Sequence, residues 1–209
     1  MSGPPTGATG AILGGGASRR MGRDKLPLKV GDTTLLERVH EALASRCAEI
    51  LIVGGGGRCV SPETRRVSDL RPGRQGPLAG IEAALLAARY QSVFIAAGDM
   101  PFLTGDLVGY LLGLLSDPLP AVVPHFGGRP HPLCAAYSRA VQPAVSSALD
   151  RGVRSVRGLL EGLSGVRYVG EEELRRCGDP NLLLLNVNSP EDLTRARAAL
   201  REGLSHHRA

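Results

Sequence analysis

The sequence contains no tryptophan, and aromatic residues make up only 3% of its 209 residues. Proteins that bind single-stranded nucleic acid stack bases on aromatic side chains, so such stacking platforms are scarce here. Lysine is nearly absent as well, since only Lys25 and Lys29 among the 25 basic residues are lysines. The arginines are spread along the chain and form no single basic run. This distribution argues against a groove for a polynucleotide.

Cysteine is also sparse, and the four cysteines form no Cys-x-x-Cys pair and no zinc-ligand spacing. We therefore expect reduced thiols in a cytoplasmic protein. No apolar run approaches the length of about 18 residues that a membrane-spanning helix needs. The first residues contain no apolar core of a secretion signal. We accordingly expect neither a membrane span nor an exported protein.

With 43% hydrophobic and 22% charged residues, the chain fits one domain with an ordinary core. We expect a flexible lead over residues 1–8, a single domain over 9–203 and a frayed tail over 204–209. Short apolar runs alternate with helix-length stretches, which favours a three-layer α/β/α fold with a mostly parallel sheet. The expected strands lie at residues 10–13, 50–53, 65–68, 92–97, 121–124, 133–137 and 166–169. The expected helices begin near residues 35, 78, 105, 139, 155 and 190, and a further apolar stretch covers 182–187.

The most informative segment is residues 12–25, where three glycines follow an apolar run. Glycine has no Cβ atom, so backbone N–H groups can approach a polyphosphate closely. Arg19, Arg20, Arg23 and Lys25 place four positive charges in the same segment. Such crowding is repulsive unless an anion binds, and a triphosphate would offset it. The segment is typical of a nucleotide-binding loop.

Two common nucleotide-binding motifs do not match this loop. A P-loop requires lysine directly after its last glycine and then serine or threonine, whereas Arg23 and Asp24 follow Gly22. The dinucleotide motif G-x-G-x-x-G requires a third glycine where this chain has Arg19. The loop therefore belongs to another class of nucleotide-binding protein.

Four further motifs follow in order along the chain: Gly-Pro-Leu-Ala-Gly at 76–80, Gly-Asp-Met-Pro at 98–101, His-Pro-Leu at 131–133 and Asn-Val-Asn-Ser-Pro at 186–190. Together with the glycine loop, this set resembles the molybdenum cofactor guanylyltransferases, the MobA family of nucleotidyltransferases. The resemblance extends from about Thr9 to Leu200. It implies the Rossmann-like nucleotidyltransferase fold, in which ligands bind at the carboxyl ends of the strands.

The resemblance assigns roles in binding GTP. Backbone groups of Leu13, Gly14 and Gly15 would hold the phosphates. Lys25 would stabilise charge at the α-phosphate, and Arg19 would hold the β- and γ-phosphates that leave as pyrophosphate. Asp69 and Gly76 would complete the nucleotide site.

Asp99 would be the ligand of Mg²⁺, because its Gly-Asp-Met-Pro segment resembles the family's metal site. Magnesium prefers carboxylate oxygen and keeps several waters, so one or two protein carboxylates suffice. His131, Asn186 and Asn188 would contact the molybdopterin substrate. The two asparagines stand at alternate positions of a stretch that we expect to be extended, so their side chains would face the same side.

The chain departs from the family at two positions. Residue 14 is glycine where alanine is usual, so the phosphate loop lacks the methyl group of that alanine. Gly54, at the end of the second strand, offers only its backbone where the family often has a side chain that contacts guanine.

The resemblance implies transfer of GMP from Mg-GTP to the phosphate of molybdopterin, with release of pyrophosphate. The expected partners are small-molecule substrates, with molybdoenzymes or cofactor-delivery proteins as protein partners and no nucleic acid or membrane. Two alternatives stay open. One is a cytidylyltransferase that acts on molybdopterin or another small phosphate. The other is a nucleotide-binding cofactor-delivery protein without turnover.

Overall fold

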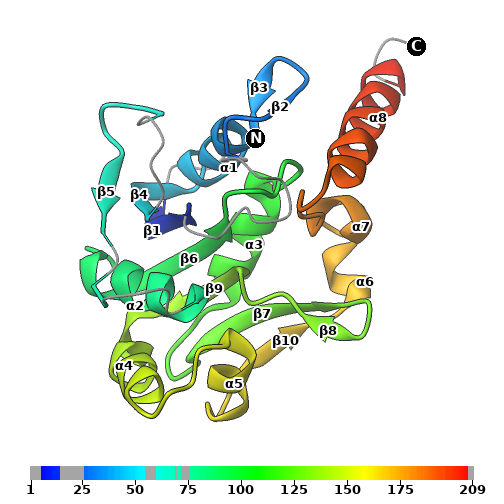
Figure 1. Cartoon of the computed structure of the whole chain (residues 1–209). Helices are drawn as coiled ribbons and strands as arrows, with labels where there is room; N and C mark the ends of the chain where they lie inside the picture. The colour runs from blue at the N-terminus through cyan, green and yellow to red at the C-terminus, as the bar shows by residue number, and fades with distance from the viewer. Residues whose placement is uncertain (1–5, 15–25, 55–59, 69, 72–75, 207–209) are drawn as a thin grey trace.

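The computed structural model of the chain describes residues 6–14, 26–54, 60–68, 70–71 and 76–206, and its centre is a sheet covered by helices on both faces (Figure 1). In spatial order its strands are β10 (Arg167–Val169), β7 (Ala121–Phe126), β9 (Cys134–Ser138), β6 (Ser92–Ala97), β1 (Thr6–Leu13), β4 (Cys47–Val53) and β5 (Arg65–Val67). A short strand, β8 (Arg129–Pro130), pairs with β7 beside this path.

The sheet is mixed but mostly parallel. Strands β6, β1, β4 and β5 run parallel to one another, and β10 runs parallel to β7. Within this sheet, as far as the structure describes it, only β9 and β8 run in the opposite direction to the other strands. The predicted α/β fold is therefore confirmed.

Helices form a layer on each face of the sheet. Helices α1 (Leu35–Ala44) and α3 (Gly105–Leu114) cover one face. The other face is covered by α2 (Pro77–Ala87), α4 (Gln142–Asp150) and α5 (Val156–Glu161). Along β6, Phe94 and Ala96 pack under the first layer, whereas Val93 and Ile95 pack under the second. Burial on both faces explains why β6 is apolar from Val93 to Ala97 instead of alternating.

Local sequence signals account for several helix ends. At α1, the Thr34 side chain accepts a hydrogen bond from the Glu37 N–H, and the Glu37 carboxylate accepts one from the Thr34 N–H. This is the predicted capping box. The hydrogen bonds that the Thr34 N–H and hydroxyl donate to the Glu37 carboxylate favour its ionised form and lower the pKa of Glu37. At α4, a 3₁₀ turn, η1 (Arg139–Val141), precedes the helix, so the predicted helix at 139–150 is divided in two.

The carboxyl-terminal helix α8 (Pro190–His206) packs against a hairpin that the sequence analysis did not predict. The hairpin consists of β2 (Lys29–Val30) and β3 (Thr33–Thr34). A small third core joins them through Val30, Leu193 and Ala196. The Ser189 hydroxyl accepts a hydrogen bond from the Asp192 N–H at 3.2 Å, as expected of a residue that caps a helix.

Both ends of the domain extend further than expected. Strand β1 begins at Thr6, because its first residues pair with β4 and β6 and bury Ala8. Helix α8 continues to His206, into the expected tail. Residues 1–5 and 207–209 lie outside the described part of the chain.

Two short helices, α6 (Glu171–Leu174) and α7 (Pro180–Leu183), lie between β10 and α8. The apolar stretch 182–187 therefore begins in a helical turn and contains no strand of the sheet. Among the helices described here, none is both long and apolar enough to pass through a bilayer.

Candidate active site

The carboxyl ends of four parallel strands meet at one edge of the sheet. Hydrogen bonds continue the strand pairing beyond these ends: the Gly14 N–H donates to the Val53 carbonyl at 2.9 Å, and the Gly54 N–H donates to the Val67 carbonyl at 2.9 Å. The Gly98 N–H donates to the Leu13 carbonyl at 3.2 Å. The segments that follow β1, β4, β5 and β6 therefore leave the sheet side by side.

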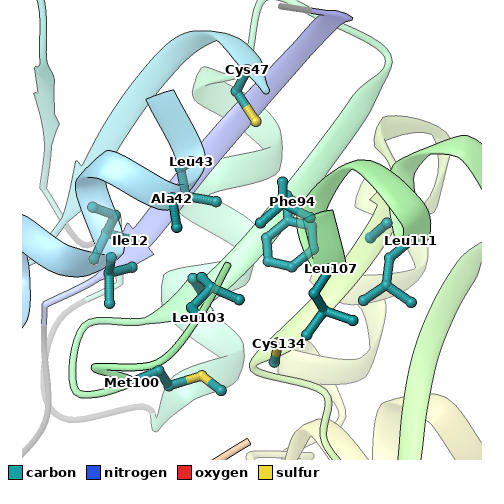
Figure 2. Close-up of a cluster of buried hydrophobic side chains, with 14 of the residues drawn as sticks. Ile12, Ala42, Leu43, Cys47, Phe94, Met100, Leu103, Leu107, Leu111 and Cys134 are labelled. Carbon is teal, nitrogen blue, oxygen red and sulfur yellow. The ribbon is translucent and has the colours of Figure 1, made fainter. Parts of the chain in front are cut away.

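Asp99 is held at this edge from two sides. Its neighbour Met100 is buried in the core with Leu103 and Cys134 (Figure 2). The Asp99 carbonyl accepts a hydrogen bond from the Val187 N–H at 2.9 Å, which joins the segment before α8 to the end of β6. Asp99 is only 7% exposed. Its carboxylate is thus placed by the core and by the Asn-Val-Asn segment.

A cavity of about 360 Å³ lies beside Asp99. Asp99, His131, Asn186 and Asn188 all line it, although they come from three distant parts of the sequence. Both asparagines face the same cavity, although residues 185–188 form no strand. Pro77, at the start of α2, lines the cavity from another side. The structure thus brings together the residues that the resemblance assigned to the metal and to the acceptor.

The His131 segment is fixed by backbone hydrogen bonds. The His131 N–H donates to the Pro124 carbonyl at 2.8 Å, and the Ala97 N–H donates to the Leu133 carbonyl at 2.8 Å. The buried Tyr137 hydroxyl donates to the Pro132 carbonyl at 2.9 Å, and burial raises the pKa of that hydroxyl. This wall of the cavity is therefore ordered before any ligand binds, which lowers the entropic cost of binding.

Burial lowers the pKa of His131, because the charged imidazolium loses hydration. A hydrogen bond between its ring and the Phe126 carbonyl acts in the opposite direction, and the charges of Arg129 and His125 reinforce the lowering. His131 is therefore neutral at pH 7. It can donate or accept a hydrogen bond in the cavity but adds no positive charge there.

This lowered pKa predicts how acid affects stability. The unfolded chain binds a proton at residue 131 at a higher pH than the folded chain does, so protonation favours unfolding as the pH falls below about 6.5. A His131→Gln variant should lose less unfolding free energy between pH 7 and about pH 5.5 than the wild type does. Urea denaturation across this range measures the difference. An equal pH dependence in the two proteins would contradict the lowered pKa of His131. Burial also lowers the pKa of His40, but this residue is present in both proteins and does not contribute to the difference between them.

Gly76 lies at the start of α2 with a φ of +77°, a conformation that favours glycine. A Cβ atom there would lie 3.0 Å from the Arg154 carbonyl oxygen, so the start of α2 closely approaches the loop after α4. The first turn of an eleven-residue helix presents unpaired N–H groups and the positive end of the helix dipole. With Pro77 on the cavity wall, this end of α2 faces the site.

Leu26 fills the space between the ends of β1 and β6. A Cβ atom at Gly98 would lie 2.6 Å from Leu26 Cδ2, and one at Gly14 would lie 3.2 Å from Leu26 Cδ1. Leu26 is buried and is the first described residue after the glycine loop. The methyl group that Gly14 lacks would therefore require Leu26 to shift by a few tenths of an ångström.

Gly15, Arg19, Lys25 and Asp69 lie outside the described residues, so their roles stay predictions. The cavity wall also includes residues that were not predicted from the sequence, among them Arg157 on the first turn of α5. Its side chain is 76% exposed and forms an ion pair with Glu161 at 2.9 Å. No motif marks Arg157. The only signal is Ser155, whose side chain caps α5 and so fixes where the helix begins.

The cavity also fits the expected magnesium ion in its donor chemistry. Asp99 supplies one hard carboxylate oxygen donor at the strand ends. Within the described part of the chain, no three acidic, histidine or cysteine side chains gather into a metal site. Magnesium suits such a place, because it commonly binds through one or two carboxylates together with substrate phosphates and water.

Comparisons with known proteins identify the family. A profile described as "MobA-like NTP transferase domain" matches residues 10–166. A protein of Pelotomaculum thermopropionicum named probable molybdenum cofactor guanylyltransferase is 39% identical over 191 residues, which cover 91% of this chain and 92% of that protein. A protein of Desulfosudis oleivorans named molybdenum cofactor guanylyltransferase is 34% identical over 203 residues, which cover 93% of this chain and 96% of that protein.

A solved structure agrees with these matches. The crystal structure of molybdopterin-guanine dinucleotide biosynthesis protein A from Archaeoglobus fulgidus is similar with a TM-score of 0.77 and 29% sequence identity. The similarity covers 93% of this chain and 99% of that one. The nucleotidyltransferase fold that the motifs implied is therefore confirmed.

Proposed function

Because this chain belongs to the family of MobA-like NTP transferases, we propose that it transfers GMP from GTP to the phosphate of molybdopterin and releases pyrophosphate. The proposal of guanylyl transfer draws on the names of its relatives, which are 34–39% identical over most of their length. The acceptor cavity is the observation that carries it. Asp99, His131, Asn186 and Asn188 line one space next to the end of β1, where the glycine loop begins.

The proposed site has two halves. The nucleotide half consists of the ends of β1, β4 and β5 and the start of α2. There, Leu13, Gly14 and Gly15 would hold the phosphates, and Asp69 and Gly76 would bind the rest of the nucleotide. The acceptor half is the cavity between Asp99 and His131, whose volume of about 360 Å³ falls in the range of small-molecule sites.

The proposed reaction needs little proton transfer. An oxygen of the acceptor phosphate attacks the α-phosphorus of GTP, a P–O bond forms, and the bond to the leaving pyrophosphate breaks. The attacking oxygen is already anionic, so no general base is required. Catalysis then depends on alignment of the two substrates and on neutralisation of the negative charge that accumulates. Lys25 and Arg19 are the proposed cations for the α-phosphate and for the leaving group.

Asp99 would hold Mg²⁺, and the bound ion would neutralise charge on the phosphate oxygens. The protein's own part is to keep Asp99 in place. The buried Met100 and the hydrogen bond from Val187 to the Asp99 carbonyl do this before substrate arrives.

The direct test is pyrophosphate release by the purified chain with molybdopterin and one nucleoside triphosphate at a time. Release with GTP and not with CTP supports the proposal. Release with CTP alone would make the chain a cytidylyltransferase. Binding of GTP without release in the presence of acceptor would make it a nucleotide-binding delivery protein.

Arg157 provides a prediction for the acceptor half. Together with Arg129 it places positive charge on the cavity wall, where an anionic acceptor would bind. We expect an Arg157→Ala variant to raise the KM for molybdopterin by about tenfold, the effect of one charge-assisted hydrogen bond at a partly exposed site. The KM for GTP should stay unchanged. Steady-state kinetics with each substrate varied in turn measures both constants.

The matched control is Arg175→Ala. Arg175 also forms an ion pair with the residue four positions before it, Glu171, but it lies just after α6 and does not line the cavity. Its loss should leave both KM values at the wild-type level. If Arg157→Ala behaved like this control, Arg157 would have no part in acceptor binding.

A further inference from the structure

Glu82 is an unusual residue at its position, because α2 is otherwise apolar and Glu82 is only 3% exposed. Burial of a carboxylate is costly unless the charge is paired and its oxygens receive hydrogen bonds. Neither the proposed reaction nor the core requires an acid here. The role of the Glu82 carboxylate is therefore inferred from the groups that contact it.

The partner of Glu82 is Arg71. The guanidinium binds both carboxylate oxygens, with Nε 2.7 Å from Oε2 and Nη2 2.7 Å from Oε1. The Ser146 hydroxyl donates a further hydrogen bond to Glu82, and Arg71 also contacts Asp150 at 2.7 Å. These donors lower the pKa of Glu82, with Arg71 as the largest cause. The carboxylate is therefore ionised at neutral pH and fully paired.

The pair connects a loop to two helices. Arg71 belongs to the connection between β5 and α2, in which Asp69 lies two residues before it and Gly76 five residues after it. Glu82 lies in the middle of α2, and both Ser146 and Asp150 belong to α4. One guanidinium thus joins the β5–α2 connection to α2 and α4, two of the helices on that face of the sheet.

We propose that Arg71 is a positioning residue that holds the β5–α2 connection in place for nucleotide binding. The proposal rests on the proposed function, which puts Asp69 and Gly76 in the nucleotide site. The Arg71 contacts hold residue 71 against α2 and α4, five residues before the start of α2 at Gly76. Contacts that restrict the chain beside a binding site before the ligand arrives lower the entropic cost of binding, so the nucleotide binds more tightly.

Stability alone does not explain the pair. A buried ion pair commonly stabilises a fold no more than apolar residues of similar size do. Leucine at position 82 would suit the apolar surface of α2, and methionine at position 71 would retain the length of the arginine stem. The Arg71→Met/Glu82→Leu double variant therefore removes the connection without leaving a buried charge unpaired.

The test compares this double variant with the wild type in steady-state kinetics. We expect the KM for GTP to rise about tenfold, with kcat and the KM for the acceptor changed by less than about twofold. The thermal midpoint should stay within a few degrees of the wild type. Arg71→Lys, which keeps the charge but not the two-point contact, should show an intermediate KM for GTP. An unchanged KM for GTP in the double variant would overturn the proposal.

The matched control is Arg175→Met/Glu171→Leu, which removes an exposed ion pair between the first residue of α6 and the residue after its end, with the same substitutions. It should leave every kinetic constant unchanged.

A second readout separates this proposal from the proposed function. Without nucleotide, amide hydrogen exchange over residues 70–77 should be faster in the Arg71→Met/Glu82→Leu variant, while exchange in β1 and β6 stays at the wild-type rate. Equal exchange over residues 70–77 would overturn the positioning role even if the wild type uses GTP. A wild-type protein that does not use GTP would overturn the proposed function. Faster exchange in the variant would in that case still show that Arg71 restrains the β5–α2 connection.

Discussion

An Asp99→Asn variant is expected to lose about 100- to 1,000-fold in kcat/KM for guanylyl transfer while it keeps the wild-type fold. Asparagine has nearly the same shape as aspartate, and the hydrogen bond from the Val187 N–H goes to the backbone carbonyl, which the substitution leaves intact. The variant therefore removes one negative charge beside the cavity and little else. The loss measures how much the reaction depends on a carboxylate at this place.

Asp106→Asn is the control for this variant. Asp106 lies in the first turn of α3, its side chain is 76% exposed, and it pairs with Arg46 away from the cavity. The same chemical change there should leave kcat/KM within about twofold, since an isolated surface ion pair contributes little. If the Asp99 and Asp106 variants were equally active, Asp99 would not belong to the site.

A Lys25→Ala variant is expected to lose activity to a similar extent, about 100- to 1,000-fold in kcat. In the proposed reaction the ammonium group stabilises negative charge at the α-phosphate, and this charge increases as the new bond forms. Because the interaction is stronger in the transition state than in the ground state, kcat should fall more than the affinity for GTP does. Single-turnover rates and calorimetric titration with GTP separate the two effects.

The chain offers a close control in Lys29, its other lysine. Lys29 is exposed on β2, and its contact with Arg197 uses the backbone carbonyl, so truncation of the side chain leaves that contact intact. Lys29→Ala should retain wild-type activity. Normal turnover in Lys25→Ala would remove Lys25 from the mechanism and leave charge neutralisation to Arg19 and the metal.

The sheet could be predicted from the sequence because burial on both faces leaves a clear pattern. The run Ser92–Ala97 was predicted with the bounds that the structure gives, since an apolar run of this length between polar turns favours a buried strand. The capping box of α1 has an equally local signal in Thr34 and Glu37. Elements with weak local signals were missed. The β2–β3 hairpin has only two residues in each strand and depends on packing against α8.

The candidate site could be predicted in part, because its motifs follow strands whose carboxyl ends meet. Asp99 lies two residues after the end of β6, and the topology of the parallel strands brings it to the end of β1. Its contact with the Asn186–Asn188 segment includes a backbone hydrogen bond between residues 99 and 187, which no pattern in the sequence reveals. Only the resemblance to the family placed the asparagines in the site.

Arg71 and Arg157 show what the sequence could not reveal. Both are arginines among many in this chain, and neither lies in a motif. The role proposed for Arg71 follows from Glu82, a buried acid eleven residues away that only the fold identifies. Arg157 reaches the cavity because α5 begins beside the His131 segment. Long-range packing thus selects which members of a common residue type take part in the site.

The mass of the product formed from each nucleoside triphosphate, with magnesium and molybdopterin present, tests the central claim most directly. The account predicts that the acceptor gains one GMP group when GTP is supplied and gains nothing from ATP, CTP or UTP. An acceptor that gains CMP instead, or that stays unmodified while GTP is bound, would contradict it.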